Sequence, residues 1–489
     1  MTSPFPAFRA RWRELKDLAG LVGLASWDQE TYMPPQAASA RAGQMATLQG
    51  LYHERLVDPV LGQLLERARE AAQTDDEKAE VRVATLERDR AVRVPADLVR
   101  ALADAQSRGV EQWKAAREAK RFDVFAPSLQ KLLKLRREQA DALGHEGNRY
   151  DALLEAYEPG LRSDRLMKTL AALREALVPR VQKWATPAPT LLDGRKFPKD
   201  AQWRFTLRLL KDMGFDFEAG RQDLSTHPFT GGTHPKDVRL TTRIDETNPF
   251  PALFGAIHEG GHGLFEQGFA EADFGTALAA APSMGLHESQ SRLWENLVGR
   301  SAPFWEHYYP LFQKECPDAL AGVSLEQWLS QVNRVERTLV RVDADEVTYN
   351  LHIILRTELE RALLAGDLSV EGLPGAWREA MDKLLGIRPQ DDKDGVLQDI
   401  HWAWGEFGYF PTYALGNLYA AQMYAAAERD LGPLAPHLRR GDLRPLQQWL
   451  SKNVHAQGYR YPAETLVERV TGKGLDQEAF VRYLDAKFD

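Results

Sequence analysis

His258-Glu259-Gly260-Gly261-His262 lies within an apolar segment of the 489-residue chain. On a helix, side chains four positions apart lie on one face, so both imidazoles can reach the same metal ion. Glu259 would then project beside that ion, where a carboxylate can take a proton from a metal-activated water molecule. The stretch therefore predicts a metal-binding helix with a general base next to the ion.

The alternative is a surface helix that carries two unrelated histidines. The flanking residues argue against it, because apolar side chains precede and follow the motif at Phe250, Leu253, Phe254, Ile257, Leu264 and Phe265. A helix that is apolar nearly all round is buried, and buried histidines need partners. Gly260 and Gly261 would each cost the helix roughly 1 kcal/mol relative to alanine. Their presence predicts that another segment approaches this backbone closely.

A third protein ligand must follow the motif, because a catalytic zinc site keeps three ligands and an open position for water. The candidates are Glu266, Glu288 and Glu295. Glu266 is one turn past His262 on the same helix, where it would crowd the ion. Glu288 stands 26 residues after His262, at the start of the next expected helix, and Arg292 and Glu295 share its helix face. The spacing favours Glu288, with Glu295 as the alternative.

Composition narrows the class of protein. The net charge of −8 argues against a nucleic-acid partner. The single cysteine, Cys316, leaves no intrachain disulfide or thiolate cluster and fits a cytoplasmic setting. The apolar run Leu18–Ala25 follows a long charged lead and is expected to form an amphipathic first helix, not a signal peptide. No apolar stretch approaches 18 residues, so no membrane span is expected.

Hydrophobic periodicity predicts a mostly α-helical protein. Apolar residues keep helical spacing through most of the chain, with a run of helices expected over 4–157 and further helices over 163–185, 199–213, 325–364 and 374–385. A proline-rich loop is expected at 187–198 and a turn-rich stretch at 386–411.

The period changes near residue 220. Residues 237–244 alternate with a period of two and are expected to form a strand. This predicts a small sheet beside the metal helix, in which an edge strand can pair with an extended substrate. An Ala- and Gly-rich loop is expected at 270–285, and the next helix at His287.

No linker or repeat interrupts the chain, which indicates a single domain over 1–489. Within it we expect an N-terminal helical part to about 215, a catalytic part from about 220 to 425, and C-terminal helices from about 426 to 489.

Seven separated motifs resemble those of the Taq-type zinc carboxypeptidases from end to end. They are Trp27-Asp28-Gln29-Glu30-Thr31, His227-Pro228-Phe229, Asp237-Val238-Arg239-Leu240-Thr241, His258-Glu259-Gly260-Gly261-His262, His287-Glu288-Ser289-Gln290, Val340-Arg341-Val342-Asp343-Ala344-Asp345 and Gly395-Val396-Leu397-Gln398-Asp399-Ile400-His401-Trp402. The family usually has isoleucine where Val340 stands. The resemblance implies a largely helical single domain with a deep groove and a gluzincin-like HExxH site with Glu288 as third ligand. It also implies a metal-dependent exopeptidase that removes C-terminal residues, usually as a homodimer.

The family's chemistry assigns roles to individual residues. Glu259 would be the general base and then the general acid to the leaving amine. The ion would be Zn²⁺, although two histidines and a glutamate also accept Co²⁺ or Mn²⁺. An oxyanion donor is needed, and Tyr409, Tyr413 and His401 are the candidates.

An exopeptidase must also bind the free C-terminal carboxylate of its peptide substrate, which arginine does best through a two-pronged contact. Arg341 is the first choice, with Arg239 and Arg243 behind it. The alternative role for Arg341 is a structural ion pair with Asp343 or Asp345. His227 and His234 are candidates to line the groove.

Two other functions are compatible with parts of this pattern. One is a zinc oligopeptidase of another helical type, which cuts internally or removes dipeptides, because the HExxH motif and Glu288 serve that chemistry equally well. The other is a non-enzymatic helical binding protein with an incidental motif.

Overall fold

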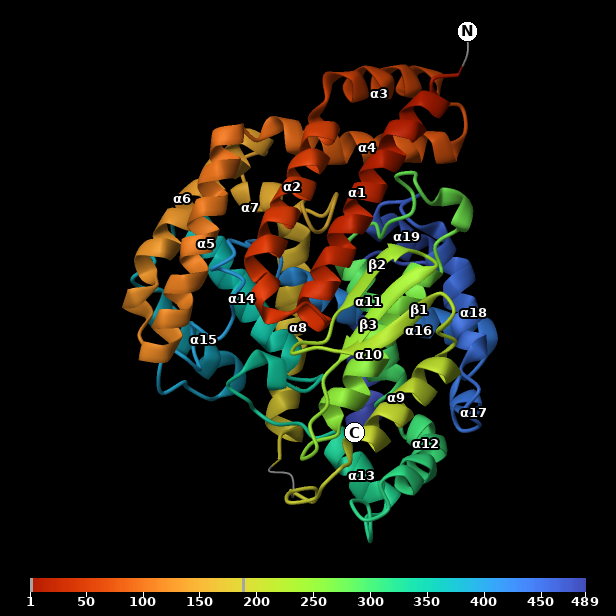
Figure 1. The fold of residues 1–489 in the computed structure, drawn as a ribbon. Helices are drawn as coiled ribbons and strands as arrows, with labels where there is room; N and C mark the ends of the chain where they lie inside the picture. The colour runs from red at the N-terminus through yellow and green to blue at the C-terminus, as the bar shows by residue number, and fades with distance from the viewer. Residues whose placement is uncertain (1–2, 187–189) are drawn as a thin grey trace.

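The computed structural model describes residues 3–186 and 190–489 and is mostly helical (Figure 1). Within this part of the chain the strands form one sheet in the order β1-β3-β2, from Gly220–Leu224, Asp237–Thr242 and Thr230–His234. β1 is parallel to β3, and β2 is antiparallel to it. The predicted class, mostly α with a small sheet, is confirmed. The strand expected at 237–244 is the central strand β3, so the edges belong to β1 and β2.

The N-terminal half is a run of helices, as expected. They are α1 (Phe5–Thr31), α2 (Ala38–Val57), α3 (Pro59–Ala71), α4 (Asp75–Arg93), α5 (Ala96–Ala119), α6 (Ala126–Leu143), α7 (Arg149–Leu154), α8 (Ser163–Trp184) and α9 (Lys199–Met213). Part of the loop expected at 187–198 lies outside the described residues, namely 187–189.

The C-terminal half begins with the helix of the HExxH stretch. Its helices are α10 (Phe250–Gln267), α11 (Met284–Arg292), the π-helix Leu293–Val298, α12 (Ala302–Glu315), α13 (Leu325–Val332), α14 (Tyr349–Ala365), α15 (Leu373–Leu385), α16 (Pro411–Leu431), α17 (Ala435–Leu438), α18 (Arg444–Asn453), α19 (Ala463–Thr471) and α20 (Glu478–Phe488). α11 starts at Met284 rather than His287, because the Ser283 hydroxyl accepts a hydrogen bond from the Leu286 amide and caps the helix. None of the described helices combines the length and hydropathy that a membrane span requires.

The single long helix expected at 325–364 is wrong. α13 ends at Val332 and α14 begins at Tyr349, and the residues between them are irregular apart from a short 3₁₀ turn. The Asp345 carboxylate accepts hydrogen bonds from the backbone amides of Glu336, Val347 and Thr348. These bonds give three backbone amides the partners that a helix would otherwise provide, which favours the irregular path.

The main core runs from α5 to α20, and α10 lies inside it, packed against β3, α9 and α11. A second, smaller cluster joins α1, α3 and α4 around Phe8 and Trp12, and Tyr459 from the C-terminal part packs against it. The sheet lies against α10 in Figure 1, so both the helix with the motif and its neighbours are held from several sides.

The two glycines of the motif mark close packing, as expected. A Cβ atom on Gly261 would lie 2.5 Å from the Gln290 carbonyl oxygen and 2.7 Å from the Cα of Ser291, both in the backbone of α11. A Cβ on Gly260 would lie 2.6 Å from the end of the Leu210 side chain. The backbone contact cannot relax without moving a helix, whereas the Leu210 methyl group can turn away.

This asymmetry predicts different costs for two neighbouring substitutions. Gly261→Ala should push α10 from α11, lowering the free energy of unfolding by about 1–3 kcal/mol and weakening metal binding. Gly260→Ala is the matched control, and it should lower both the free energy of unfolding and the metal affinity by less. Denaturant unfolding and metal titration of the two variants measure this, and equal losses would contradict the account.

Candidate active site

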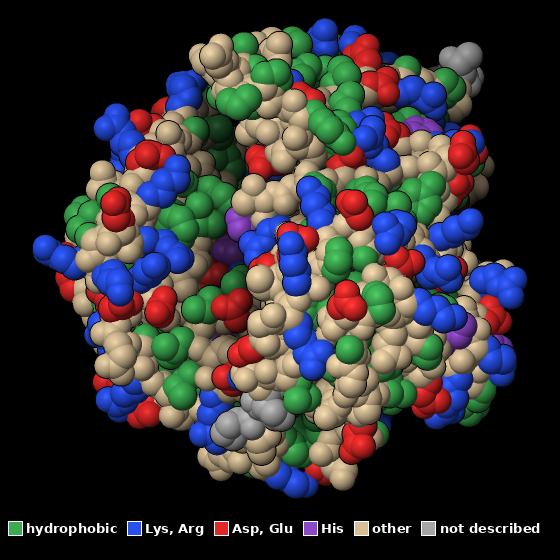
Figure 2. All heavy atoms as spheres, turned by 60° about the horizontal axis from the view of Figure 1, so that its bottom comes forward, with side chains coloured by type: hydrophobic (Ala, Val, Ile, Leu, Met, Phe, Trp, Pro, Cys, Tyr) green, Lys and Arg blue, Asp and Glu red, His purple; other side chains and the backbone are tan. Residues whose placement is uncertain are grey.

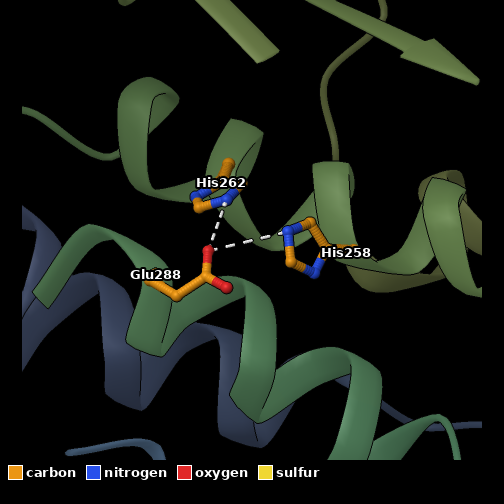
Figure 3. Close-up of side chains that lie close together, drawn as sticks. All are labelled: His258, His262 and Glu288. Carbon is orange, nitrogen blue, oxygen red and sulfur yellow. Dashed lines mark ion pairs between the residues drawn. The ribbon is translucent and has the colours of Figure 1, made fainter. Parts of the chain in front are cut away.

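Three side chains from two helices converge at one point. His258 and His262 project from α10 and Glu288 from α11, and their ligand atoms all lie within 4.8 Å of one another. Glu288 Oε2 is 3.3 Å from His262 Nε2 and 3.7 Å from His258 Nε2 (Figure 3). Ligand atoms at about 2 Å from a tetrahedral ion lie roughly 3.3 Å apart, so two imidazoles and one carboxylate at this spacing fit a catalytic zinc site.

The other two candidates for third ligand have different partners. Glu295 Oε2 lies 2.9 Å from His258 Nδ1, on the side of that ring away from Glu288. Glu266 Oε1 lies 2.9 Å from Nε2 of His287, whose ring stacks on that of His262 with centroids 4.4 Å apart. A carboxylate on the second nitrogen of a metal-binding histidine orients the ring and raises its basicity. Glu295 is therefore placed to orient the His258 ring, whereas Glu266 bonds to a ring that only stacks on His262, and neither belongs to the group in which His258, His262 and Glu288 converge.

Arginines hold Glu288 of α11 and Glu295 of the π-helix that follows it in the charged state. Arg292 donates from Nε to Glu288 at 2.7 Å and from Nη1 to Glu295 at 3.2 Å, and Arg300 donates to the other oxygen of Glu295 at 2.9 Å. Burial alone would raise the pKa of the Glu288 carboxyl, but Arg292 and the two histidines outweigh it and hold that pKa well below its ordinary value. Burial lowers the pKa of His262 to about 3, which keeps the imidazole neutral, the form that binds a metal.

Glu259 has no such cation. Its Oε2 accepts a hydrogen bond from the Thr230 hydroxyl of β2 at 2.6 Å. Burial raises the pKa of the Glu259 carboxyl above its ordinary value. A carboxylate whose pKa is raised is a stronger base than an ordinary one, which suits a group that must take up a proton.

A cavity of about 230 Å³ opens onto these groups. It is lined by Phe229, Thr230, Glu259, His262, Met284, His287, Glu288, Tyr409, Thr412 and Tyr413. Figure 2 shows the surface hollowed on this face of the molecule, with histidine and acidic side chains inside the hollow. Two of the expected oxyanion donors, Tyr409 and Tyr413, thus line the cavity. The third, His401, is buried behind them, with its Nε2 3.1 Å from the Tyr413 hydroxyl.

The arginine expected to bind the substrate's carboxylate is buried beside this cavity. Arg341 donates from Nε and Nη2 to Asp399 at 2.9 and 2.8 Å and from Nη1 to Tyr349 at 2.8 Å. Its guanidinium lies 5.0 Å from the centre of the Tyr413 ring. The ion-pair partner is therefore Asp399, and not Asp343 or Asp345 as the alternative role for Arg341 had it. The Asp345 carboxylate bonds instead to Glu336, Val347 and Thr348.

The remaining sequence candidates lie outside the described cavity lining. Arg239 bonds to Asp237 at 2.9 Å and lies over the Trp27 ring, and Arg243 is exposed. His227 is exposed, and His234 stacks edge-on against Phe274.

Comparison with known proteins agrees with this geometry. The model of the family described as carboxypeptidase Taq (M32) metallopeptidase matches residues 7–488. The chain belongs to this metallocarboxypeptidase family. Thermostable carboxypeptidase 1 of Thermus thermophilus is 44% identical, and the match covers 97% of this chain and 96% of that protein. Carboxypeptidase 1 of Bacillus subtilis is 36% identical, and the match covers 96% of this chain and 94% of that protein. The crystal structure of M32 carboxypeptidase from Deinococcus radiodurans matches with a TM-score of 0.97 and 40% identity, covering 100% of this chain and 99% of that one. The chain is accordingly a metallocarboxypeptidase, and the recognised resemblance is confirmed.

Sequence reasoning missed several residues of this metallocarboxypeptidase site. Thr230, His287 and Thr412 line the cavity, and Arg292 joins two carboxylates. The bonds from Arg292 to Glu288 and Glu295 could have been predicted from the spacing of the three residues, because they share a helix face. The sequence holds no comparable signal for Thr230, which reaches Glu259 from a strand 29 residues earlier.

Conservative replacements separate the ligand from its support. Glu288→Gln should abolish tight metal binding, because it removes a charged ligand. Glu295→Gln should keep the metal but weaken its binding about 10- to 100-fold, the usual cost of losing a partner of a ligating histidine. Competition with a chelator measures both affinities, and the reverse order would make Glu295 the third ligand.

The first turn of α11 is bonded to a buried carboxyl from the N-terminal half. Glu158 Oε1 accepts a hydrogen bond from the Gly285 amide at 2.5 Å, and burial raises the pKa of Glu158 to about 8. The folded state therefore binds this proton more tightly than the unfolded state, whose glutamate has a pKa of about 4.5. Stability from this group is full below pH 4.5 and is lost as the pH rises toward 8.

Glu158→Gln tests this dependence because glutamine does not titrate. The unfolding free energy of the metal-free wild type should fall relative to that of the variant between pH 4.5 and 8. Denaturant titrations across that range measure the difference. Two parallel curves would show that Glu158 titrates normally.

Proposed function

We propose that His258, His262 and Glu288 hold a zinc ion and that Glu259 serves as the proton-transfer residue for removal of C-terminal amino acids from peptides. The observation that carries the proposal is the convergence of three ligand atoms within 4.8 Å beside a cavity that Glu259 also lines. A divalent metal bound there would polarise the scissile carbonyl and lower the pKa of a water molecule. Co²⁺ and Mn²⁺ are compatible with the same ligands.

Glu259 acts first as general base and then as general acid in this proposal. Its pKa is raised by burial, so it can accept the proton of the attacking water and pass it to the amine that leaves. The Thr230 hydroxyl donates a hydrogen bond to Oε2 of this carboxylate, and Oε1 is proposed to take the proton.

Tyr409 and Tyr413 are proposed as donors to the oxyanion. Both line the same cavity as His262 and Glu288, so their hydroxyls are candidates to donate to a carbonyl bound there. His401 is proposed to orient Tyr413 through their 3.1 Å contact, because it lies behind the tyrosine and outside the cavity lining.

Arg341 is proposed to bind the free carboxylate of the substrate. Its three contacts with Asp399 and Tyr349 leave further N–H donors on Nη1 and Nη2, since a guanidinium offers two on each of these atoms. The side chain is only 8% exposed, so a charge pair with substrate would be shielded from water. Arg239 and His227, which are not in the cavity lining, are proposed to contact upstream parts of a peptide.

The resemblance to the family also supports a homodimer that acts on peptides. The single cysteine supports a cytoplasmic setting, and the net charge of −8 argues against a nucleic-acid partner. Light scattering of the purified protein measures the mass in solution, and a monomer would contradict this part of the proposal.

The function itself is tested on one defined peptide. Release of single C-terminal residues, stopped by a chelator and restored by Zn²⁺, is expected. Internal fragments or dipeptides would favour the oligopeptidase alternative.

The role of Glu259 predicts a specific separation of effects. Glu259→Gln should retain the metal, because the ligands are untouched, and lose about 10²- to 10⁴-fold in kcat, the size of a lost general base. Metal content by mass spectrometry and steady-state kinetics measure the two quantities. A variant that keeps its activity would remove Glu259 from the mechanism.

The role of Arg341 predicts a dependence on the substrate's terminal charge. Amidated peptides should be cleaved roughly 30- to several-thousand-fold more slowly than free acids, the value of a shielded charge pair. Arg341→Ala should lose a similar factor on free acids and little more on amides, and Arg341→Lys should recover only part. A purely structural Arg341–Asp399 pair predicts equal losses in kcat/KM on both substrates instead.

A further inference from the structure

Arg292 stands between the proposed third ligand and the residue that supports the first. Its Nε donates to Glu288 Oε1 at 2.7 Å, and its Nη1 donates to Glu295 Oε2 at 3.2 Å. The same Glu295 oxygen lies 2.9 Å from His258 Nδ1. The guanidinium also lies 4.6 Å from the centre of the Tyr349 ring, and its side chain is 15% exposed. Its position is therefore fixed from several sides.

The two oxygens of Glu288 have different surroundings. Oε2 faces both imidazoles, at 3.3 and 3.7 Å, and also accepts from the Ser291 hydroxyl at 3.1 Å. Oε1 is held by Arg292 in a short, charge-assisted hydrogen bond of the strong class. Glutamate can bind a metal through one oxygen or through both, and two-oxygen binding here would require Oε1 to leave the guanidinium.

We propose that Arg292 is a positioning residue that restricts Glu288 to one-oxygen ligation and thereby keeps a coordination position open for water and substrate. The inference rests on the proposed metal site and deepens it. A catalytic site needs that open position, whereas a fully occupied ion is structural. Because Arg292 also holds Glu295, the same guanidinium fixes the orientation of His258 relative to Glu288.

Arg300 provides a matched control. It donates to Glu295 Oε1 at 2.9 Å and lies over the Phe254 ring, so its replacement removes a neighbouring positive charge and a bond to Glu295. Its described contacts do not include Glu288. If Arg292 acted only by neutralising buried carboxylates, loss of either arginine would have the same effect on the metal.

The first test needs no substitution. In a crystal structure of the Zn²⁺-loaded wild type, Oε2 of Glu288 should lie at about 2.0–2.2 Å from the ion, while Oε1 remains on Arg292. Two-oxygen ligation in the wild type would overturn the inference while leaving the proposed function intact. A wild type that binds no metal or releases no C-terminal residue would instead overturn the proposed function.

The second test uses Co²⁺ as the probe, because its visible absorption weakens as ligands are added. Arg292→Gln should shift and weaken the Co²⁺ absorption, since Oε1 becomes free to bind, and should lower kcat about 10- to 100-fold. Arg292→Lys should restore the wild-type spectrum by keeping a cation on Oε1, and Arg300→Gln should leave the spectrum unchanged. An unaltered spectrum in Arg292→Gln, or the same shift in Arg300→Gln, would overturn the inference. If Arg292→Gln does not fold, the wild-type structure decides.

Discussion

The close approach of α10 and α11 at Gly261 is the constraint on which the site depends. The three ligand atoms come from two helices, so the distance between them is set by how closely the helix backbones pack. At Gly261 a single added carbon would lie 2.5 Å from the Gln290 carbonyl. His262 follows this glycine directly, and Glu288 precedes Gln290 by two residues. The absence of a side chain at one position thus brings an imidazole and a carboxylate within reach of one ion, at a cost in helix propensity that the packing outweighs.

Buried carboxylates near the metal ligands fall into two electrostatic groups. Glu288 and Glu295 share Arg292, and the pKa of each carboxyl lies below its ordinary value despite burial. Glu259 lies beside them with a neutral donor, Thr230, and its pKa is raised. When neighbouring titratable groups have pKa values shifted in opposite directions, one group can transfer protons while the other stays charged. Charged carboxylates suit permanent ligation and support, whereas a carboxyl with a raised pKa suits proton transfer. The placement of arginines therefore distinguishes residues that the sequence presents simply as glutamates.

Local patterns predicted much of this arrangement. The HExxH spacing gives the face of α10, the paired glycines indicate a close neighbour, and residue spacing favours Glu288. The features that the sequence did not predict depend on distant contacts. The break between α13 and α14 relies on backbone bonds to Asp345, which compete with helical ones. The partner of Arg341 is Asp399, 58 residues away, while the nearer aspartates that the sequence suggested do not pair with it. Local propensity contains no information about which distant segment supplies such a partner, and tertiary packing decides it.

The N-terminal half contributes to the site although the motif is far from it in sequence. The Tyr157 carbonyl accepts a hydrogen bond from the Met284 amide, and Glu158 accepts one from Gly285, so both hold the first turn of α11. The Tyr157 ring packs edge-on against Tyr409, which lines the cavity, with ring centres 5.1 Å apart. One short segment therefore supports the helix that carries Glu288 and a tyrosine proposed to stabilise the oxyanion. Both supports come from residues 157 and 158, which lie before the catalytic part expected at about 220–425. The segment between α7 and α8 is in this sense part of the site's support, because the first turn of α11 is bonded to residues from the N-terminal half.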